Sequence, residues 1–266
     1  MAFTRTDMLA AVERSPAAFA VHDRMAWVDA FTPGGRVEDP VGTLPHRGRA
    51  AITRFYDTFI GPRDIKFHHD VDIVAGSTVI RDLDLEVKMA SGLTMRVPAY
   101  LYYDVLEDDG QLKIAELYAF WELPTMVGQF LRSGVRSVPA GLKLSKAMLL
   151  NQGFGGTLGF LNGFRGVGRE GKLRFGEFLA DAQAGNEVAV RRWLTRKATI
   201  TTGDGRSLTA TELLTRLRGT RSHKVIGAGK HLVVGIDRGD TRDVLIADVS
   251  VKPFAINRIR YFSDRD

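Results

Sequence analysis

Near its N-terminus the chain contains the stretch Val37-Glu38-Asp39-Pro40-Val41-Gly42, and this stretch decides the fold. Residues 36–39 are expected to form a short strand, because Pro33-Gly34-Gly35 precedes them and Pro40 follows. The proline and the glycines at positions 42 and 48 predict a loop over 40–48. The sequence therefore predicts a strand that ends on a single carboxylate, that of Asp39, at the start of a loop.

Helices are predicted on both sides of this strand. Upstream, residues 8–12 and 17–31 carry apolar side chains at mixed spacings of three and four, which is typical of a helix packed on a sheet. Pro33-Gly34-Gly35 is expected to end that helix. Downstream, a second helix over 48–60 is expected to end at Gly61-Pro62 and to carry on one side Ile52, Phe55, Tyr56 and Phe59.

Four long strands are predicted after the second helix, at 66–74, 78–89, 94–105 and 112–121. Ser91-Gly92 and Asp108-Asp109-Gly110 are hairpin signals between them. Within the strand at 78–89 the acidic residues Asp82, Asp84 and Glu86 alternate with apolar ones, which indicates one wet face. This order of elements predicts an α+β domain in which helices cover one face of a curved antiparallel sheet.

The same order recurs in a shorter form in the second half of the chain. Aligned without a gap, residues 23–39 and 186–202 pair Met25 with Val188 and Val37 with Ile200, and we interpret this as a degenerate internal duplication. The predicted fold is therefore a tandem of cone-shaped curved antiparallel sheets, each covered by helices. These sheets are expected to pack on each other within one chain or between two copies. Helices are predicted at 175–194 and 208–218, and strands at 198–202, 224–228, 231–237, 243–251 and 257–262.

Charge divides the chain further. Residues 126–172 are rich in glycine and hold seven basic residues against one acidic residue, Glu170, so this segment alone accounts for the net charge of +6. We interpret it as a basic linker between a first domain, 1–125, and a second, 173–266. Its alternative role is contact with an anionic membrane surface. A nucleic-acid partner is not indicated, because the excess basic charge is confined to this segment.

The rest of the composition is that of an ordinary soluble protein, with 44% apolar and 26% charged residues. The absence of cysteine excludes disulfides, thiolate nucleophiles and cysteine-based metal sites. The charged N-terminus has no apolar signal region, and no apolar run is long enough to span a membrane. We therefore expect a cytoplasmic protein.

The stretch 37–42, with Pro45, Gly48, Ala50-Ala51-Ile52 and Phe55-Tyr56 after it, resembles the signature of delta-5-3-ketosteroid isomerases. The resemblance covers the first 123 residues and is specific at 37–56. It implies the fold of the nuclear transport factor 2-like superfamily, which includes SnoaL-like polyketide cyclases, epoxide hydrolases and non-enzymatic binders. It also implies a reaction without metal or cofactor on a hydrophobic, steroid- or polyketide-like carbonyl compound.

In that family an aspartate moves a proton next to a carbonyl, while a tyrosine and a protonated aspartate stabilise the oxyanion. The resemblance puts the base at Asp39. The two donor positions fall on Ser15 and Leu101, and neither supplies an equivalent donor. Tyr103 has the same inward parity as Leu101 on its strand and is the candidate substitute, with Tyr56 as another.

Two functions remain open. The first is a proton-transfer isomerase with Asp39 as general base, because an apolar cavity raises the pKa of a carboxyl group. The second is a hydrophobic-ligand-binding protein that kept the pocket and lost the oxyanion donors. The structural alternatives are a turn-capping Asp39 and core aromatics at 103 and 121. The residues expected to contact a ligand are Tyr56, Leu101, Leu117, Ala119 and Trp121.

A metal site is not expected. His68, Asp70 and Asp72 share one face of a predicted strand. Three ligands in succession along one strand are geometrically awkward for one ion, so we interpret these residues as part of a solvated face.

Overall fold

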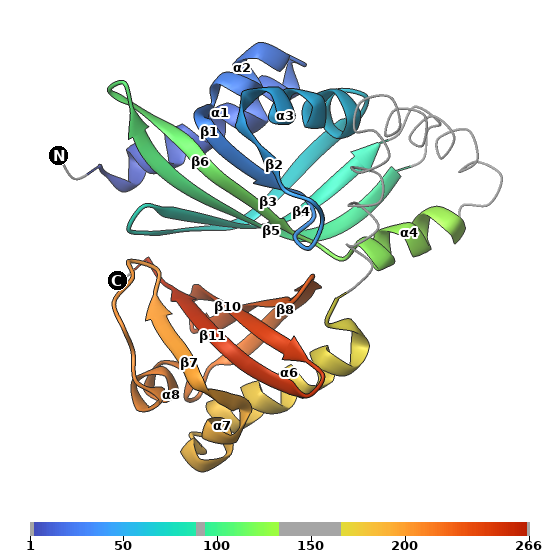
Figure 1. Cartoon of the computed structure of the whole chain (residues 1–266). Helices are drawn as coiled ribbons and strands as arrows, with labels where there is room; N and C mark the ends of the chain where they lie inside the picture. The colour runs from blue at the N-terminus through green and yellow to red at the C-terminus, as the bar shows by residue number, and fades with distance from the viewer. Residues whose placement is uncertain (1–2, 89–93, 133–165, 265–266) are drawn as a thin grey trace.

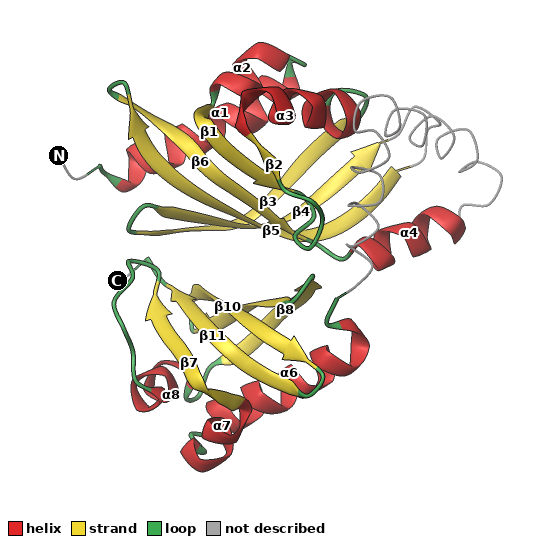
Figure 2. Ribbon diagram, in the orientation of Figure 1, coloured by secondary structure: helices red, strands yellow, loops and turns green. Residues whose placement is uncertain are grey.

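The computed structural model describes residues 3–88, 94–132 and 166–264. Two curved sheets lie at the centre and helices cover their outer faces, so the layers run helix, sheet, sheet, helix (Figure 1 and Figure 2). The predicted α+β class with two curved, helix-covered sheets is confirmed. We call residues 3–132 the first domain and residues 166–264 the second domain.

The first domain is built on a sheet with the strand order β2-β1-β6-β5-β4-β3. Its pairs are antiparallel except for β1 with β6, which is parallel, so the sheet is mixed rather than wholly antiparallel as predicted. Its helices are α1 (Arg5–Ala20), α2 (Arg24–Asp29), α3 (Gly48–Phe55), a π-helical turn η1 (Tyr56–Ile60) and α4 (Leu123–Arg132). Its strands are β1 (Phe31–Glu38), β2 (His46–Arg47), β3 (Asp64–Ala75), β4 (Thr78–Lys88), β5 (Thr94–Asp108) and β6 (Gln111–Phe120).

The helical segment before β1 differs from its prediction. A single helix over 17–31 is wrong, because Asp23 caps a separate helix: its Oδ1 accepts a hydrogen bond from Ala26 N at 2.9 Å. The strand then begins at Phe31, so Pro33-Gly34-Gly35 lies inside β1. The pairing of β1 with β6 shifts register between Phe31 and Arg36, and a proline without an N–H is tolerated at such a bulge.

The second domain has the strand order β7-β11-β10-β9-β8, and β7 again runs parallel to β11. A single helix over 175–194 is also wrong, because Gly185 has a φ of 75° and Asn186 caps a new helix by accepting from Ala189 N at 3.2 Å. The helices are α6 (Gly168–Gln183), α7 (Glu187–Trp193) and α8 (Ala210–Leu217). The strands are β7 (Leu194–Thr202), β8 (Arg221–Ala228), β9 (His231–Arg238), β10 (Thr241–Val251) and β11 (Phe254–Phe262).

The two sheets share their topology and register, which is consistent with the predicted duplication. In both, the strand after two helices pairs in parallel with the last strand. Val37 lies opposite Leu117 in the first sheet, and Ile200, which the alignment pairs with Val37, lies opposite Ile259 in the second. The aligned residues Asp23 and Asn186 are also both helix N-caps.

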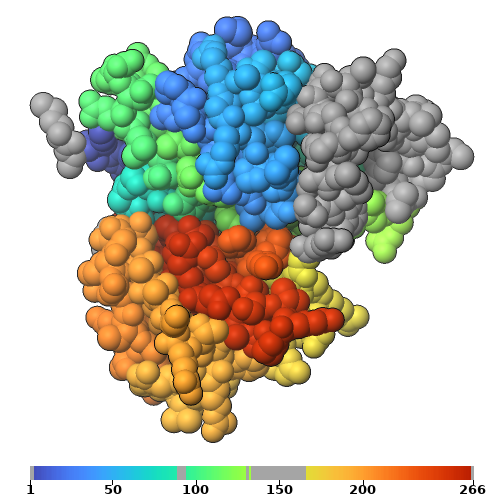
Figure 3. All heavy atoms as spheres, in the orientation of Figure 1, coloured from blue at the N-terminus to red at the C-terminus, as the bar shows by residue number. Residues whose placement is uncertain are grey.

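The sheets pack against each other through the faces that the helices leave uncovered, and Figure 3 shows the two domains in contact along this seam. The apolar residues of both sheets form one buried cluster there, as expected for two stacked sheets. The cluster comprises Val41, Ile73, Ala75, Ile80, Tyr100 and Phe120 of the first domain, and Ile226, Ala228, Val233, Val244, Ile246 and Phe262 of the second.

Most of the predicted basic linker lies outside the described residues, which resume at Gly166. The predicted divisions after residues 125 and 172 fall inside α4 and α6. The proposed membrane-surface role therefore concerns a segment largely outside the structure described here. None of the described helices combines the length and the apolar character that a membrane-spanning helix needs.

A buried ion-pair network crosses the seam. Asp82 of β4 is fully buried, and the Lys224 ammonium of β8 lies 2.5 Å from its Oδ1. Lys224 also donates to the backbone carbonyls of Leu83 at 2.9 Å and Ala99 at 3.1 Å. Arg242 of β10 contacts the other carboxylate oxygen of Asp82 at 3.0 Å. The charges that would oppose sheet packing are thus paired across it.

Replacing Lys224 by methionine should lower the free energy of unfolding by about 2–4 kcal/mol, because it removes one charge partner of Asp82 and one donor from each of two backbone carbonyls. The control is Asp84→Asn, since Asp84 lies 3.8 Å from the same ammonium but its side chain is 43% exposed, and it should change stability by about 0.5 kcal/mol or less. Urea denaturation of both variants measures the difference, and equal losses would contradict this account.

Candidate functional site

Asp39 follows the last residue of β1 and begins a loop whose backbone is held on both sides. Val41 N donates to the carbonyl of Ala119 at 2.9 Å, which ties the loop to β6. Gly42 N donates to Oε1 of Glu38 at 2.8 Å, and Glu38 is itself buried. These bonds fix the direction in which the partly buried Asp39 side chain leaves the chain.

Trp121 holds the carboxylate of Asp39. Its indole Nε1 donates to Asp39 Oδ1 at 2.6 Å. The two residues meet because β1 and β6 are parallel and Glu38 lies opposite Tyr118, so the strands end side by side. A charge-assisted hydrogen bond of this length fixes one carboxylate oxygen and leaves the other for a ligand.

The two residues lie on the wall of a cavity of about 100 Å³, which we call the site cavity. Among the described residues that line it, the only charged ones are Asp39 and Arg63. The volume is below the range of roughly 300–1,000 Å³ that is usual for pockets of drug-sized ligands. The site cavity is therefore too small to enclose a whole ligand of that size, and it has room for one end of it. Besides these two and Trp121, its lining residues are Phe55, Phe59, Ile60, Ile65, Leu85, Val87, Met95, Val97 and Met126.

Arg63 is a site residue that sequence reasoning missed. Its Nη1 donates to the carbonyl of Thr58 at 3.0 Å and to that of Phe59, which anchors the guanidinium beside the π-helical turn. A guanidinium offers more donors than these two bonds use. Burial lowers the pKa of Arg63 to about 10, while the charge of Asp39 raises it, so the group stays cationic at neutral pH. The available signal was a basic residue directly after the helix stop Gly61-Pro62.

The electrostatics of the cavity act mainly on Asp39. Burial raises the pKa of its carboxyl group to about 6, against the lowering effects of the Trp121 hydrogen bond and the Arg63 charge. A carboxylate with this pKa is mostly ionised at neutral pH but remains a stronger base than an ordinary aspartate. That is the state that favours proton abstraction near pH 7.

The other predicted residues lie deeper in the first domain. Tyr103, Leu101, Leu117 and Ala119 are buried in the core cluster that also contains α1 residues, and they are not among the described residues that line the site cavity. Leu101 pairs with Ala119 and Tyr103 with Leu117, so their predicted common face is as expected. Burial raises the pKa of the Tyr103 hydroxyl, which therefore stays protonated.

Tyr56 packs toward the helices and does not line the cavity. Its ring lies 5.3 Å from that of Trp27 on α2, measured between centroids. The hydroxyl is buried and has no hydrogen-bond partner among the described residues. Burial, together with the charges of Asp23 and Asp57, raises its pKa. The site cavity thus brings together Asp39 and Trp121 from the predicted set and adds Arg63.

The acidic and histidine residues of β3 do not act as one face. The pairing of β3 with β4 shifts register between His69 and Val71, so the bulge at Asp70 breaks the predicted alternation. His68 lies 3.0 Å from Glu86, and Asp72 lies 3.3 Å from the Arg81 guanidinium. Asp70 turns to the second domain, where Asp70, Asp82 and His223 approach within 4.8 Å of one another. Arg242 contacts both of these aspartates and neutralises them.

Comparison with known proteins agrees with this fold. The sequence profile of the SnoaL-like domain family matches residues 12–117, a range that includes Asp39 and Arg63 and ends before Trp121. No curated protein matches the chain significantly.

Several solved structures are similar to the first domain. Delta 5-3-ketosteroid isomerase from Mycobacterium sp. is 26% identical over 44% of this chain and 95% of that chain, with a TM-score of 0.41. A Mycobacterium tuberculosis protein solved with estradiol-17beta-hemisuccinate is 22% identical over 44% of this chain and 95% of that chain, with a TM-score of 0.40. An LEH-like epoxide hydrolase from Mycobacterium tuberculosis is 18% identical over 51% of this chain and 97% of that chain, with a TM-score of 0.42.

Asp39→Asn should stabilise the folded protein at neutral pH. The folded pKa of about 6 exceeds the ordinary value of 3.8, so the folded state binds the proton more tightly than the unfolded chain. This contribution is present below pH 3.8 and is lost as the pH rises through 6, a change of about 1–3 kcal/mol. Asparagine cannot ionise and keeps the Trp121 bond. Urea denaturation between pH 3.8 and 7 should show the free energy of unfolding of Asp39→Asn rising relative to that of the wild type. The control is Asp240→Asn, at an exposed residue, whose difference from the wild type should stay constant over this range.

Trp121→Phe should raise the pKa of Asp39 above its value of about 6, because the indole N–H stabilises the ionised form. NMR titration of the Asp39 carboxyl carbon measures this directly. Trp193→Phe is the matched control, since that indole donates to Asp181 in the second domain. An unchanged or lowered pKa in Trp121→Phe would show that the hydrogen bond does not hold the carboxylate.

Proposed function

Because residues 12–117 form a SnoaL-like domain, we propose that the first domain binds the carbonyl end of a hydrophobic compound and that Asp39 acts on it as a general base. The observation that carries this proposal is the position of Asp39. Its carboxylate is hydrogen-bonded to Trp121 at the wall of an otherwise apolar cavity, with a pKa raised to about 6 by burial. If Asp39 only capped a turn, its carboxylate would not need to lie at the wall of an apolar cavity.

The proposed reaction is a proton transfer on a β,γ-unsaturated ketone. Asp39 removes a proton from the carbon between the carbonyl and the double bond, which gives a dienolate with its negative charge on oxygen. The protonated Asp39 then returns the same proton to the γ-carbon, and the conjugated ketone results. No net gain or loss of atoms or electrons accompanies the step.

Arg63 is proposed to stabilise the dienolate oxygen. The family donors are replaced by Ser15 and Leu101, both buried, and Tyr103 does not line the cavity. Arg63 is the cation on the cavity wall, and its position is fixed by the carbonyls of Thr58 and Phe59. A preorganised donor in a site of low polarity acts on charge that develops in the transition state.

The alternative is a binding protein without catalysis. The observation that favours it is the burial of Tyr103 in the core behind the cavity, because it leaves Arg63 as the sole charged donor among the described lining residues. In that case Asp39 and Arg63 would orient a polar group of the ligand through hydrogen bonds, and the apolar wall would supply the affinity.

Asp39→Asn should lower kcat about 10²–10⁴-fold for conversion of a β,γ-unsaturated 3-ketosteroid, because the amide cannot accept the proton. Arg63→Gln should lower kcat about 10²–10³-fold with the dissociation constant of the conjugated product little changed. Arg24→Gln is the control for lost charge, since Arg24 is exposed and pairs with Asp57 away from the cavity. The absorbance of the conjugated enone follows the reaction.

The same assay separates the two candidate functions. Ligand binding without turnover in the wild-type protein would favour the binding protein, and turnover that survives in Asp39→Asn would refute Asp39 as the base. Failure of any hydrophobic ketone to raise the melting temperature would count against both.

A further inference from the structure

The site cavity is one of three neighbouring cavities along α4. A second cavity, of about 180 Å³, shares Val97 and Met126 with it. A third, of about 540 Å³, lies between the two domains, and we call it the interdomain cavity. It shares with the second cavity the residues Glu122, Thr125, Lys172 and Val225.

Neighbouring cavities in this group are lined in part by the same side chains. Met126 stands between the first two, and methionine is an unbranched, flexible side chain that adapts to irregular neighbours. The shared lining residues thus place the three cavities next to one another along α4, with the site cavity at one end and the interdomain cavity at the other. With the Met126 side chain turned aside, the neighbouring cavities have room for a molecule longer than the site cavity alone holds.

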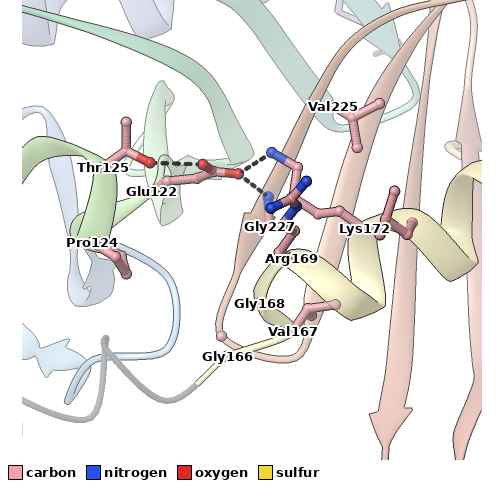
Figure 4. A pocket seen from close by; sticks show the side chains of 12 residues that line it. Glu122, Pro124, Thr125, Gly166, Val167, Gly168, Arg169, Lys172, Val225 and Gly227 are labelled. Carbon is pink, nitrogen blue, oxygen red and sulfur yellow. Dashed lines mark hydrogen bonds and ion pairs between the residues drawn. The ribbon is translucent and has the colours of Figure 1, made fainter. Parts of the chain in front are cut away.

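Polarity changes from one end of this group of cavities to the other. The site cavity is apolar except for Asp39 and Arg63, whereas the interdomain cavity contains the charged residues Glu122, Arg169 and Lys172 (Figure 4). Glu122 accepts bonds from Lys172 Nζ at 2.5 Å, Thr125 Oγ1 at 2.9 Å and Gly227 N at 3.2 Å. Burial works to raise the pKa of Glu122, but these bonds lower it overall, so its carboxylate stays ionised and fully partnered.

The described residues that line the interdomain cavity carry an excess of one positive charge. The Lys172 ammonium and the Glu122 carboxylate neutralise each other. Arg169 is exposed, lines the same cavity and forms no ion pair with any residue that the structure describes. The interdomain cavity therefore favours an anionic group over a neutral or cationic one.

From these observations we infer that the natural ligand is an elongated amphipathic acid, whose ketone lies beside Asp39 and whose anionic group lies in the interdomain cavity near Arg169. The inference rests on the proposed function of the site cavity and adds the substrate class. It also assigns a role to the second domain, because α6 and β8 supply Arg169, Lys172 and Val225, which select the far end of the ligand.

The test compares two ketosteroids, testosterone and testosterone 17-hemisuccinate, which share the 3-ketone and differ in the carboxylate at the opposite end. The wild type should bind the hemisuccinate about fivefold more tightly by isothermal titration calorimetry, and the preference should shrink at high salt. Arg169→Gln should remove the preference and leave testosterone binding unchanged. Arg174→Gln should keep it, because Arg174 is exposed on the same helix and pairs with Glu177.

A second variant tests the path itself. Val225 lines both the second and the interdomain cavity, so Val225→Trp should narrow the space between them. This variant should bind the hemisuccinate more weakly than the wild type does and bind testosterone equally well. Equal binding of the two steroids by the wild type, or an undiminished preference in Arg169→Gln, would overturn the inference while leaving the proposed function standing. If neither steroid binds, the proposed function falls and the inference falls with it.

Discussion

The parallel pairing of β1 with β6 is the constraint on which the candidate site depends. It sets the ends of the two strands side by side, so that residues 82 positions apart in the chain, Asp39 and Trp121, meet through a 2.6 Å hydrogen bond. No local turn chemistry joins residues at this separation; sheet register does. The pairing thereby places the carboxylate on the wall of the apolar cavity, where burial raises its pKa and where the π-helical turn also brings Arg63.

The second domain repeats the pairing and fills the interior. By the register of β7 with β11, the places of Asp39 and Ala119 are taken by Thr202 and Tyr261. Tyr261 is fully buried, and its hydroxyl donates to Asp243 at 2.5 Å. The second domain thus has the large side chain of Tyr261 at the position where the first domain has the methyl group of Ala119. The scaffold is the same in both halves, but only the first keeps a carboxylate beside an apolar cavity among the described residues.

The sequence predicted the long strands of both sheets closely because clear turn signals separate them, and it placed Asp39 correctly where a strand ends. It missed β2 and the first residues of β1 and β7. The alternation of side chains along β5 predicted that Tyr103 points to the inner face of the sheet. It could not predict that Tyr103 lies in the core rather than on the cavity wall, because that depends on how α1 covers the sheet. Arg63 was missed because its direction is set by the π-helical turn before it, which no residue pattern announces. The acidic alternation around Asp82 predicted a wet face, which is wrong for Asp82 because this residue is buried. Its charged partners come from strands more than 100 residues away, which the local pattern cannot indicate.

The seam between the sheets has a consequence for how such a chain is divided. If the first domain stood alone, the face that now carries Val41, Ile80, Tyr100 and Phe120 would meet water, together with the unneutralised Asp82. An exposed apolar sheet face tends to associate with other apolar surfaces. If two copies of the first domain met through this face, their Asp82 carboxylates would be brought together without a positive partner. The second domain of the same polypeptide removes this conflict, because in the network at the seam the first domain supplies the acid Asp82 and the second supplies the bases Lys224 and Arg242. Two domains of one chain can carry opposite charges on facing surfaces, which a symmetric pair of identical chains does not permit.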